Sequence, residues 1–231
     1  AIDYAGNIGE CRLVFTIDIS SPMVSILSPE EGSYIGEQDV TVTWEGDDNI
    51  GIDHYEVRID GGSWINVGTD TNYTFTGLSE GSHVVDVRVY DYAGNIGEDS
   101  VSFTVDLNPP SVSITSPTDE EYLNVRDVTV EWVGSDSIGI AYYEVRLDSG
   151  SWINVSTSTS YTFTGVDDGN HTVYVRAFDR AGNVAYDSVS FIVDTTPPTV
   201  VIVTPSNGSA VGGENVTILV NSSDIHNDTT W

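Results

Sequence analysis

A repeat of 88 residues runs through this sequence of 231 residues. Trp44 recurs 88 positions later as Trp132, and Trp64 recurs at the same spacing as Trp152. The triplet Ala-Gly-Asn occurs at 5–7, 93–95 and 181–183, again in one register. Because no insertion or deletion disturbs the spacing, the fold must be built from one structural unit that is used more than once.

The repeat register predicts two complete units between two partial ones. Residues 1–20 align with the end of a unit, and residues 197–231 align with the beginning of one. We therefore expect the C-terminal end of a preceding repeat at 1–20, complete domains at 21–108 and 109–196, and the N-terminal part of a following repeat at 197–231. The pattern is typical of a window on a longer tandem array.

Apolar and polar residues alternate with a period of two throughout each unit. Val128, Val130 and Trp132, for example, alternate with Thr129 and Glu131. No stretch keeps the spacing of a helix, and clusters of Gly, Asp, Asn and Pro separate six or seven such runs in each unit. This arrangement predicts an all-β fold of tandem antiparallel β-sandwiches.

Two short segments read as linkers between the domains. They have the sequences VDLNPP at 105–110 and VDTTPP at 193–198. Consecutive prolines favour a stiff and extended backbone, so we expect neighbouring domains to be held at restricted angles, like segments of a rod.

The charge of the chain is strongly one-sided. The sequence holds 36 acidic residues and 7 basic ones, for a net charge of −29, and every basic residue is Arg. Such a chain repels phosphate backbones and anionic lipids, which excludes nucleic acid as a partner and favours cations. No apolar run reaches the roughly 18 residues of a membrane helix, so we expect no membrane insertion by this segment. The one cysteine, Cys11, rules out a disulfide within the chain.

Three strings recur in both units: Y-E-V-R-x-D-x-G-S-W-I-N, G-x-H-x-V-x-V-R and D-x-A-G-N. They resemble the Ig-like and fibronectin type III-like tandem repeats of bacterial and archaeal cell-surface proteins. The resemblance implies a sandwich fold and an extracellular or cell-surface location. Fibronectin type III domains usually carry a Tyr where His83 and His171 stand, which implies that the hydrogen bond of the tyrosine corner is either missing here or made by an imidazole.

Aspartates recur at three places in every copy that covers them. They are Asp48, Asp136 and Asp224 after the second strand, Asp3, Asp91 and Asp179 at the mouth of the last hairpin, and Asp18, Asp106 and Asp194 at the end of the last strand.

In an Ig-like sandwich the loop after the second strand and the loop of the last hairpin share one pole, and the last strand of the preceding domain arrives there. We therefore expect Asp18 to approach Asp48 and Asp91. In the same way, Asp106, with Asn108 beside it, should approach Asp136 and Asp179. Three carboxylates and nearby carbonyl groups suit Ca²⁺, which takes six to eight oxygen ligands. The alternative is that each aspartate only caps its own turn.

Seven asparagines begin an N-x-S/T sequon, the acceptor sequence for N-glycosylation. They are Asn72, Asn154, Asn170, Asn207, Asn215, Asn221 and Asn227. Modification of some of them would imply export of the protein.

Other polar and aromatic residues predict structure rather than catalysis. The histidines and Cys11 show no spacing that indicates a nucleophile with its base, so we expect no enzyme and no catalytic residue. Trp44 and Trp132 lie in apolar register and should be core residues. Trp64 and Trp152 could be exposed platforms for a carbohydrate or could cover the edge of the sandwich. Four arginines should pair across strands with acidic neighbours: Arg58, Arg88, Arg146 and Arg176.

These observations together predict a structural role. The chain is interpreted as a stiff, acidic, Ca²⁺-rigidified and glycosylated rod within an exported, archaeal cell-surface protein, such as a surface layer, a stalk or an extracellular filament. Its partners would be other copies of itself, neighbouring surface proteins or a glycan. The alternatives are an adhesin or carbohydrate-binding Ig-like array, and accessory domains of a secreted enzyme.

Overall fold

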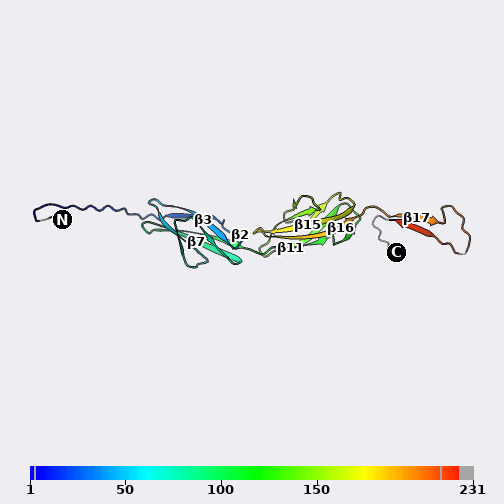
Figure 1. Ribbon diagram of the computed structural model, residues 1–231, viewed down its shortest axis with the longest axis horizontal. Helices are drawn as coiled ribbons and strands as arrows, with labels where there is room; N and C mark the ends of the chain where they lie inside the picture. The colour runs from blue at the N-terminus through cyan, green and yellow to red at the C-terminus, as the bar shows by residue number, and fades with distance from the viewer. Residues whose placement is uncertain (3, 214, 224–231) are drawn as a thin grey trace. The chain divides into compact units, whose positions relative to one another are not determined.

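The computed structural model describes residues 1–2, 4–213 and 215–223. It divides into two units, residues 1–108 and residues 109–231. Every regular element among the described residues is a strand, and each unit contains a two-layered sandwich (Figure 1). The predicted all-β class of tandem Ig-like sandwiches is therefore confirmed.

The first unit packs a sheet of three strands against a sheet of five. The small sheet has the order β1-β3-β6, with β1 at Met23–Ser28, β3 at Val40–Asp47 and β6 at Asn72–Phe75. The large sheet has the order β2-β8-β7-β4-β5, with β2 at Ser33–Ile35, β8 at Ile96–Val105, β7 at Gly81–Asp91, β4 at Ile52–Ile59 and β5 at Ile65–Gly68. All pairs are antiparallel except β2 with β8.

The second unit repeats this topology. Its small sheet has the order β14-β11-β9, with β14 at Ser160–Phe163, β11 at Val128–Ser135 and β9 at Ser111–Ser116. Its large sheet has the order β10-β16-β15-β12-β13, with β10 at Glu121–Leu123, β16 at Val184–Val193, β15 at Gly169–Asp179, β12 at Ile140–Leu147 and β13 at Ile153–Asn154. A separate hairpin follows, made of β17 at Thr199–Thr204 and β18 at Leu219–Ser223.

Each sandwich has eight strands rather than the six or seven that alternation indicates. The additional strands are short: β2 and β10 have three residues each and β13 has two. A run of two or three residues shows no measurable alternation, which explains why sequence reasoning missed them. Strands β1 and β2 join opposite sheets, and the cis peptide bond Ser28–Pro29 lies between them.

One tryptophan lies at the centre of each core. Trp44 and Trp132 are each 2% exposed, as the apolar register predicts. Each meets a tyrosine of the facing sheet edge-on, Tyr55 in the first unit and Tyr143 in the second, with ring centroids 5.8 Å apart in both. Two separately packed clusters of buried residues surround these pairs, one in each unit.

A glycine makes room for each of these tyrosine rings. A Cβ atom at Gly134 would lie 2.5 Å from the Tyr143 hydroxyl oxygen, and one at Gly46 would overlap the Tyr55 hydroxyl in the same way. Both glycines lie in strands, where glycine is otherwise unfavourable. Their presence in both units follows from the close approach of the ring to the backbone.

Candidate functional site

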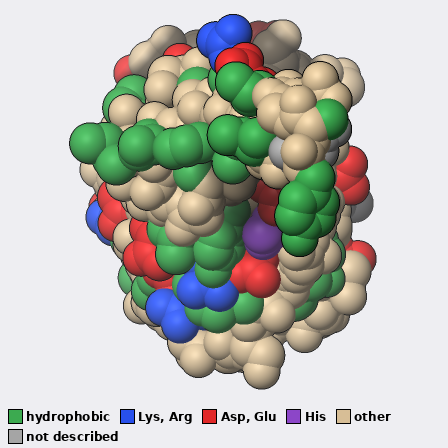
Figure 2. Space-filling view, turned by 90° about the vertical axis from the view of Figure 1, so that its left-hand side faces the viewer, with side chains coloured by type: hydrophobic (Ala, Val, Ile, Leu, Met, Phe, Trp, Pro, Cys, Tyr) green, Lys and Arg blue, Asp and Glu red, His purple; other side chains and the backbone are tan. Residues whose placement is uncertain are grey.

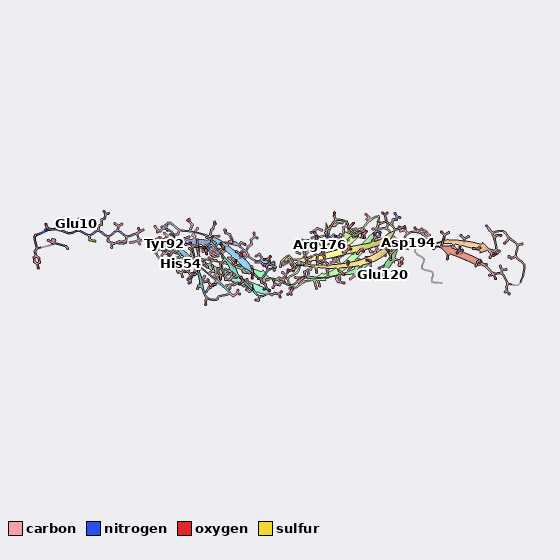
Figure 3. The ribbon with its side chains drawn as sticks, viewed as in Figure 1. Glu10, His54, Tyr92, Glu120, Arg176 and Asp194 are labelled. Atoms are coloured by element: carbon pink, nitrogen blue, oxygen red, sulfur yellow. The ribbon has the colours of Figure 1, made fainter. Side chains whose placement is uncertain are left out.

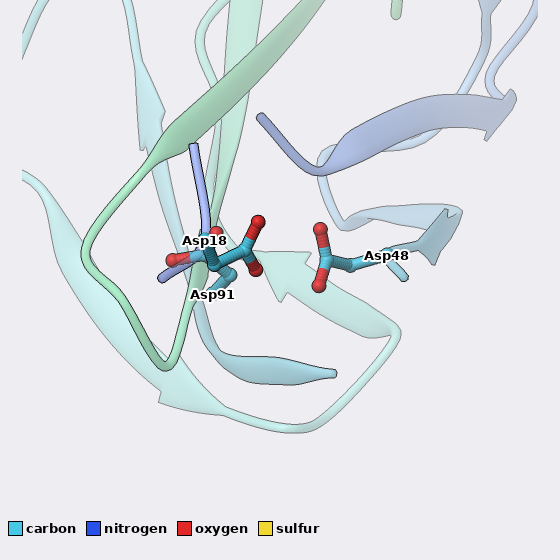
Figure 4. Close-up of side chains that lie close together, drawn as sticks. All are labelled: Asp18, Asp48 and Asp91. Atoms are coloured by element: carbon cyan, nitrogen blue, oxygen red, sulfur yellow. The ribbon is translucent and has the colours of Figure 1, made fainter. Parts of the chain in front are cut away.

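Three aspartates from distant parts of the chain meet at one pole of the first unit (Figure 4). Asp18 precedes β1, Asp48 follows β3, and Asp91 ends β7. Each offers one carboxylate oxygen, and these three oxygens lie within 4.8 Å of one another. The sequence predicts this trio by the recurrence of its members, and the structure brings all three together.

Each of these carboxylates also accepts hydrogen bonds from its own turn. Asp48 Oδ2 accepts from the backbone N–H groups of Ile50 and Gly51, at 2.8 Å each. Asp91 Oδ1 accepts from the N–H groups of Ala93 and Asn95, also at 2.8 Å. Each aspartate therefore caps its own turn and also meets the other two at one pole.

Asn95 ties the pole to the segment that enters the unit. Its Nδ2 donates to Asp91 Oδ2 at 2.7 Å and to the carbonyl oxygen of Asp18 at 3.3 Å. Burial would raise the pKa of Asp91, but the hydrogen bonds from the Asn95 side chain and from the backbone of residues 93–95 outweigh it and lower that pKa. Asp91 is 2% exposed and stays ionised at neutral pH.

Two oxygens at this pole have no hydrogen-bond donor among the described residues. They are Asp18 Oδ2 and Asp48 Oδ1, and both are buried. A buried carboxylate oxygen without a donor is costly, and it is more costly beside two other carboxylates. A cation that replaces the missing donors would remove both costs. The oxygen-only ligand set fits a hard cation such as Ca²⁺.

The second predicted trio has members in both units. Asp106 directly follows β8 in the first unit and is 4% exposed. Asp136 and Asp179 belong to the second unit, where one carboxylate oxygen from each lies within 4.8 Å of the other. Asp136 Oδ1 accepts from the N–H groups of Ile138 and Gly139, as Asp48 does with its own turn. Asp3 and Asp224 lie outside the described residues.

Asn108, predicted as a further metal ligand, takes part in a clamp on the linker. Its Nδ2 donates to Glu80 Oε2 at 2.7 Å, while Glu80 Oε1 accepts from the N–H of Leu107 at 3.2 Å. Glu80 directly precedes β7, so this one side chain fixes the first linker residues to the body of the unit that they leave.

The second unit contains the same clamp with different residues. Asp168 precedes β15 and accepts from the Oγ1 atoms of Thr195, at 2.8 Å, and Thr196, at 3.2 Å. Hydrogen bonds from Thr195, with the charge of Arg126, lower the pKa of Asp168 despite its partial desolvation. Sequence reasoning missed both clamps. The available signal was the acidic residue before the recurring G-x-H string, Glu80 in one repeat and Asp168 in the other.

His83 and His171 each bridge two acceptors. His83 Nδ1 donates to Asp60 Oδ2 at 2.7 Å and Nε2 donates to the carbonyl oxygen of Ser79 at 2.8 Å. His171 makes the same contacts with Asp148, at 2.9 Å, and with the carbonyl oxygen of Asp167, at 2.8 Å. In both units the imidazole makes the corner hydrogen bond that a tyrosine would otherwise make.

Both ring nitrogens face oxygens that carry no hydrogen, so the doubly protonated imidazolium is the form that satisfies both bonds. Burial opposes this charge, but the bonds to Ser79 and Asp60 and the charge of Asp60 outweigh it and raise the pKa of His83. For His171, burial is likewise outweighed by the bonds to Asp148 and the carbonyl of Asp167 and by the charges of both aspartates, and its pKa is raised.

Trp64 and Trp152 have guanidinium groups over their rings. The Cζ atoms of Arg58 and Arg88 lie 4.4 and 4.0 Å from the centroid of the Trp64 ring. In the second unit those of Arg146 and Arg176 lie 4.6 and 4.2 Å from Trp152 (Arg176 is labelled in Figure 3). Both tryptophans are half-buried. The rings are therefore covered by the protein itself, which favours a structural role over a carbohydrate platform.

Three of these arginines also form ion pairs across strands. Arg58 pairs with Asp86, Arg88 with Glu56 and Arg176 with Glu144. The predicted acidic partners are therefore present for these three. Arg146 stacks on Tyr174, the residue that replaces Asp86 in the second repeat, with its Cζ 4.4 Å from the ring centroid.

Replacing Trp64 by alanine should lower the free energy of unfolding of the first unit by about 1 kcal/mol, because two guanidinium groups lose their aromatic partner. Trp152→Ala should have a similar effect on the second unit. Urea titration followed by circular dichroism measures both. A stability equal to that of the unsubstituted protein, together with lost binding to a carbohydrate, would instead support a platform.

The described sequon asparagines are all exposed: Asn72, Asn154, Asn170, Asn207, Asn215 and Asn221. Asn154 Oδ1 accepts from the N–H of Ser156 at 2.9 Å. Asn227 lies outside the described residues. The structure thus places six of the seven predicted modification sites where a transferase could reach them.

The surface carries many acidic side chains and some apolar ones (Figure 2). Leu13, Phe15 and Ile17 are more than 70% exposed, whereas Phe103, which stands one repeat after Phe15, is 1% exposed. Residues 13–17 therefore show the alternation of a sandwich strand, but their apolar side chains are exposed, whereas Phe103 is buried in the first unit. No helix among the described residues is long and apolar enough to span a membrane.

Comparison with known proteins identifies relatives of each unit. A family model described as "Bacterial Ig domain" matches residues 22–87 and 110–175. Exoglucanase B of Cellulomonas fimi is 30% identical over 231 aligned positions, which cover 90% of this chain and 20% of that protein. Chitinase A1 of Niallia circulans is 29% identical over 193 positions, which cover 79% of this chain and 27% of that protein.

Solved structures support the fold in the same way. The fibronectin(III)-like modules of CbhA from Clostridium thermocellum superpose with a TM-score of 0.56 at 22% identity, over 74% of this chain and 94% of that one. The chain thus spans about a fifth of one enzyme and slightly more than a quarter of the other, and it matches nearly the whole of a structure of such modules.

Proposed function

Because this chain belongs to the bacterial Ig domain family, we propose that it is a spacer of tandem Ig-like domains in an exported cell-surface protein. The spacer sets a distance and an orientation and performs no chemistry. A surface layer, a stalk or an extracellular filament of an archaeon would use such a segment, and the acidic surface keeps it solvated.

The observation that carries this proposal is the clamp on each linker. A spacer requires that the chain leaves a domain in a defined direction. Glu80 fixes residues 107 and 108, and Asp168 fixes residues 195 and 196, in each case directly before two consecutive prolines. The clamp is kept in both repeats although the residues that form it differ. A loop under selection for binding a ligand would instead diverge between repeats.

Calcium is the second part of this proposal. A Ca²⁺ ion held by Asp18, Asp48 and Asp91 would bind the entering segment to two loops of the first unit. Asp106, Asp136 and Asp179 stand at the matching positions one repeat later, and Asn108 follows Asp106 by two residues. Such an ion would neutralise neighbouring carboxylates and would stiffen the entry to the first unit, just as the clamp stiffens its exit.

The clamp is tested by measuring distances between spin labels on the two units. Ser100→Cys and Ser188→Cys, in a Cys11→Ser background, place the labels at exposed and repeat-matched positions. We expect a narrow distance distribution in this protein and a broader one after Glu80→Gln. Glu30→Gln, which changes an exposed carboxylate outside the clamp, should leave the distribution narrow. A broad distribution before any substitution at Glu80 would contradict a stiff spacer.

Calcium binding is tested by calorimetry on the full chain. We expect Ca²⁺ to bind and to raise the melting temperature, because a ligand that binds only the folded state stabilises that state. Asp48→Asn should remove one site, whereas Asp47→Asn, at the adjacent exposed carboxylate, should retain it. Absence of binding, or equal binding by both variants, would show that the carboxylates only cap their turns.

A related function is favoured by the similarity to two polysaccharide-degrading enzymes. The same spacer could separate the modules of an exported hydrolase. In that case the intact protein would carry a catalytic module outside these 231 residues, and its mass on a denaturing gel together with activity on a glucan or on chitin would reveal it. A protein that consists of Ig-like repeats throughout would favour the surface rod.

A further inference from the structure

Asn170 belongs to a row of outward-facing side chains on the large sheet of the second unit. It pairs with Ile192 of β16, and Ile192 pairs in turn with Tyr122 of β10. The neighbours of these residues along each strand face the core: Val193 and Phe191 are buried, and Leu123 packs on the same cluster. Directly paired residues have their side chains on the same face, so Asn170, Ile192 and Tyr122 lie side by side on the outer face.

This row lies in a surface groove of about 450 Å³. Tyr122 is 54% exposed in this groove. The apolar side chain of Ile192 also lines the groove. Glu120, Thr172 and Ser190 supply polar groups along the groove (Glu120 is labelled in Figure 3). The groove thus combines an aromatic ring and an apolar floor with hydrogen-bonding groups, a combination that suits one sugar ring, which has an apolar C–H face and polar hydroxyls.

Asn170 itself is available for modification. Its side chain is exposed and makes no hydrogen bond within the described part of the chain. Asn154 differs, since its Oδ1 is held by the backbone of Ser156. Asn170, His171 and Thr172 form a sequon, and the residues at the matching places of the first unit, Ser82, His83 and Val84, do not.

We propose that Asn170 carries an N-linked glycan whose first sugar lies in this groove, against Tyr122 and Ile192. The proposal rests on the proposed export of the protein, because export brings the chain to a glycosyltransferase. In the reaction Asn170 Nδ2 attacks the anomeric carbon of a lipid-linked glycosyl phosphate. The new N–C bond forms as the bond from that carbon to the phosphate oxygen breaks. The amide loses one proton and the lipid phosphate leaves.

The first unit provides a natural comparison. Its equivalent row is Ser82, Thr104 and Tyr34, joined by the same pairing of strands. The aromatic residue is kept, but the acceptor asparagine is absent. A glycan on this face is therefore specific to the second unit, and Tyr34 is a matched control for Tyr122.

Mass spectrometry of the protein purified from the cells that make it tests the modification. Cleavage before aspartate releases residues 168–178, which contain Asn170 and no other sequon. We expect this peptide to carry the added mass of one or more sugars, and Thr172→Ala to abolish that mass. An unmodified peptide overturns the inference. If this peptide is unmodified but other sequon peptides carry sugars, the proposed export is supported and only the assignment of a glycan to Asn170 is wrong. Protease treatment of intact cells tests export without reference to any glycan.

The position of the sugar is tested by its coupling to Tyr122. Tyr122→Ala should lower the melting temperature of the glycosylated protein by about 4 °C and that of the Thr172→Ala protein by at most about 1 °C. Tyr34→Ala should change the melting temperatures of the glycosylated protein and of the Thr172→Ala protein by the same amount. Equal shifts for Tyr122→Ala in the two forms would mean that the sugar does not rest in the groove, and would overturn that part of the inference.

Discussion

Replacing Trp132 by alanine is expected to lower the free energy of unfolding of the second unit by about 3–5 kcal/mol. The indole is 2% exposed and meets Tyr143 edge-on, so its removal leaves a cavity between the two sheets and ends an aromatic contact. The first unit has its own buried cluster, so its transition should not move. Urea unfolding followed by circular dichroism should therefore separate into an early and an unchanged transition.

Two variants control this result. Trp44→Ala should reverse the order and destabilise the first unit. Val133→Ala, next to Trp132 on β11 but 59% exposed, should change stability by less than about 0.5 kcal/mol. If Trp132→Ala shifted both transitions together, the two units would unfold as one body and the independence of their cores would be wrong.

Substitution of His83 and His171 is expected to cause the next largest decrease in the free energy of unfolding, and the size of that decrease should depend on pH. The pKa of each imidazole is raised in the folded chain. Its contribution is thus fully present below the unfolded pKa of about 6.5 and is lost as pH rises through the higher folded pKa. The double variant His83→Gln, His171→Gln should lower the free energy of unfolding by about 2 kcal/mol per unit at pH 6 and by much less at pH 9.

The groups around each ring fix the sign of this dependence. Asp60 faces His83, and Asp148 faces His171 together with Asp167. The pKa of Asp60 is lowered, because the bonds from His83 and Val84 outweigh its desolvation, so its own contribution falls only in acid. Asp60→Asn should weaken the dependence between pH 6 and 9 in the first unit alone. A difference between the double variant and the unsubstituted protein that stays constant over this range would contradict the imidazolium.

The repeats keep some features and change others, and this difference bears on function. The linker clamp, the histidine bridge and the stacked tryptophan occur in both units. All of them hold the chain in place, and none presents an open binding surface. The sequon at Asn170 has no counterpart at the matching position of the first unit, where Ser82 stands. The proposed spacer, repeated for its mechanics and carrying the proposed glycan on its exterior, would account for both observations.

Some of the site could be predicted because repetition reveals it. An aspartate that returns every 88 positions, as Asp48 returns at Asp136, stands out without any structure. Knowledge of how an Ig-like sandwich joins its loops then placed Asp18, Asp48 and Asp91 together. The clamps escaped prediction because Glu80 and Asp168 differ in type, and because their partners lie 27 or 28 residues away along the chain.

The sequence by itself determined the repeat length, the strand alternation, the burial of Trp44 and Trp132, and the membership of the acidic trio in the first unit. These are properties of local period and of recurrence, which can be read along the chain. Only the tertiary structure decided that Asp18 Oδ2 and Asp48 Oδ1 lack donors, that two arginines cover Trp64 and two cover Trp152, and that both nitrogens of His83 meet oxygens. Hydrogen bonding and burial depend on which strands become neighbours, and strand pairing across tens of residues is set by the packing of the whole sandwich rather than by any local stretch.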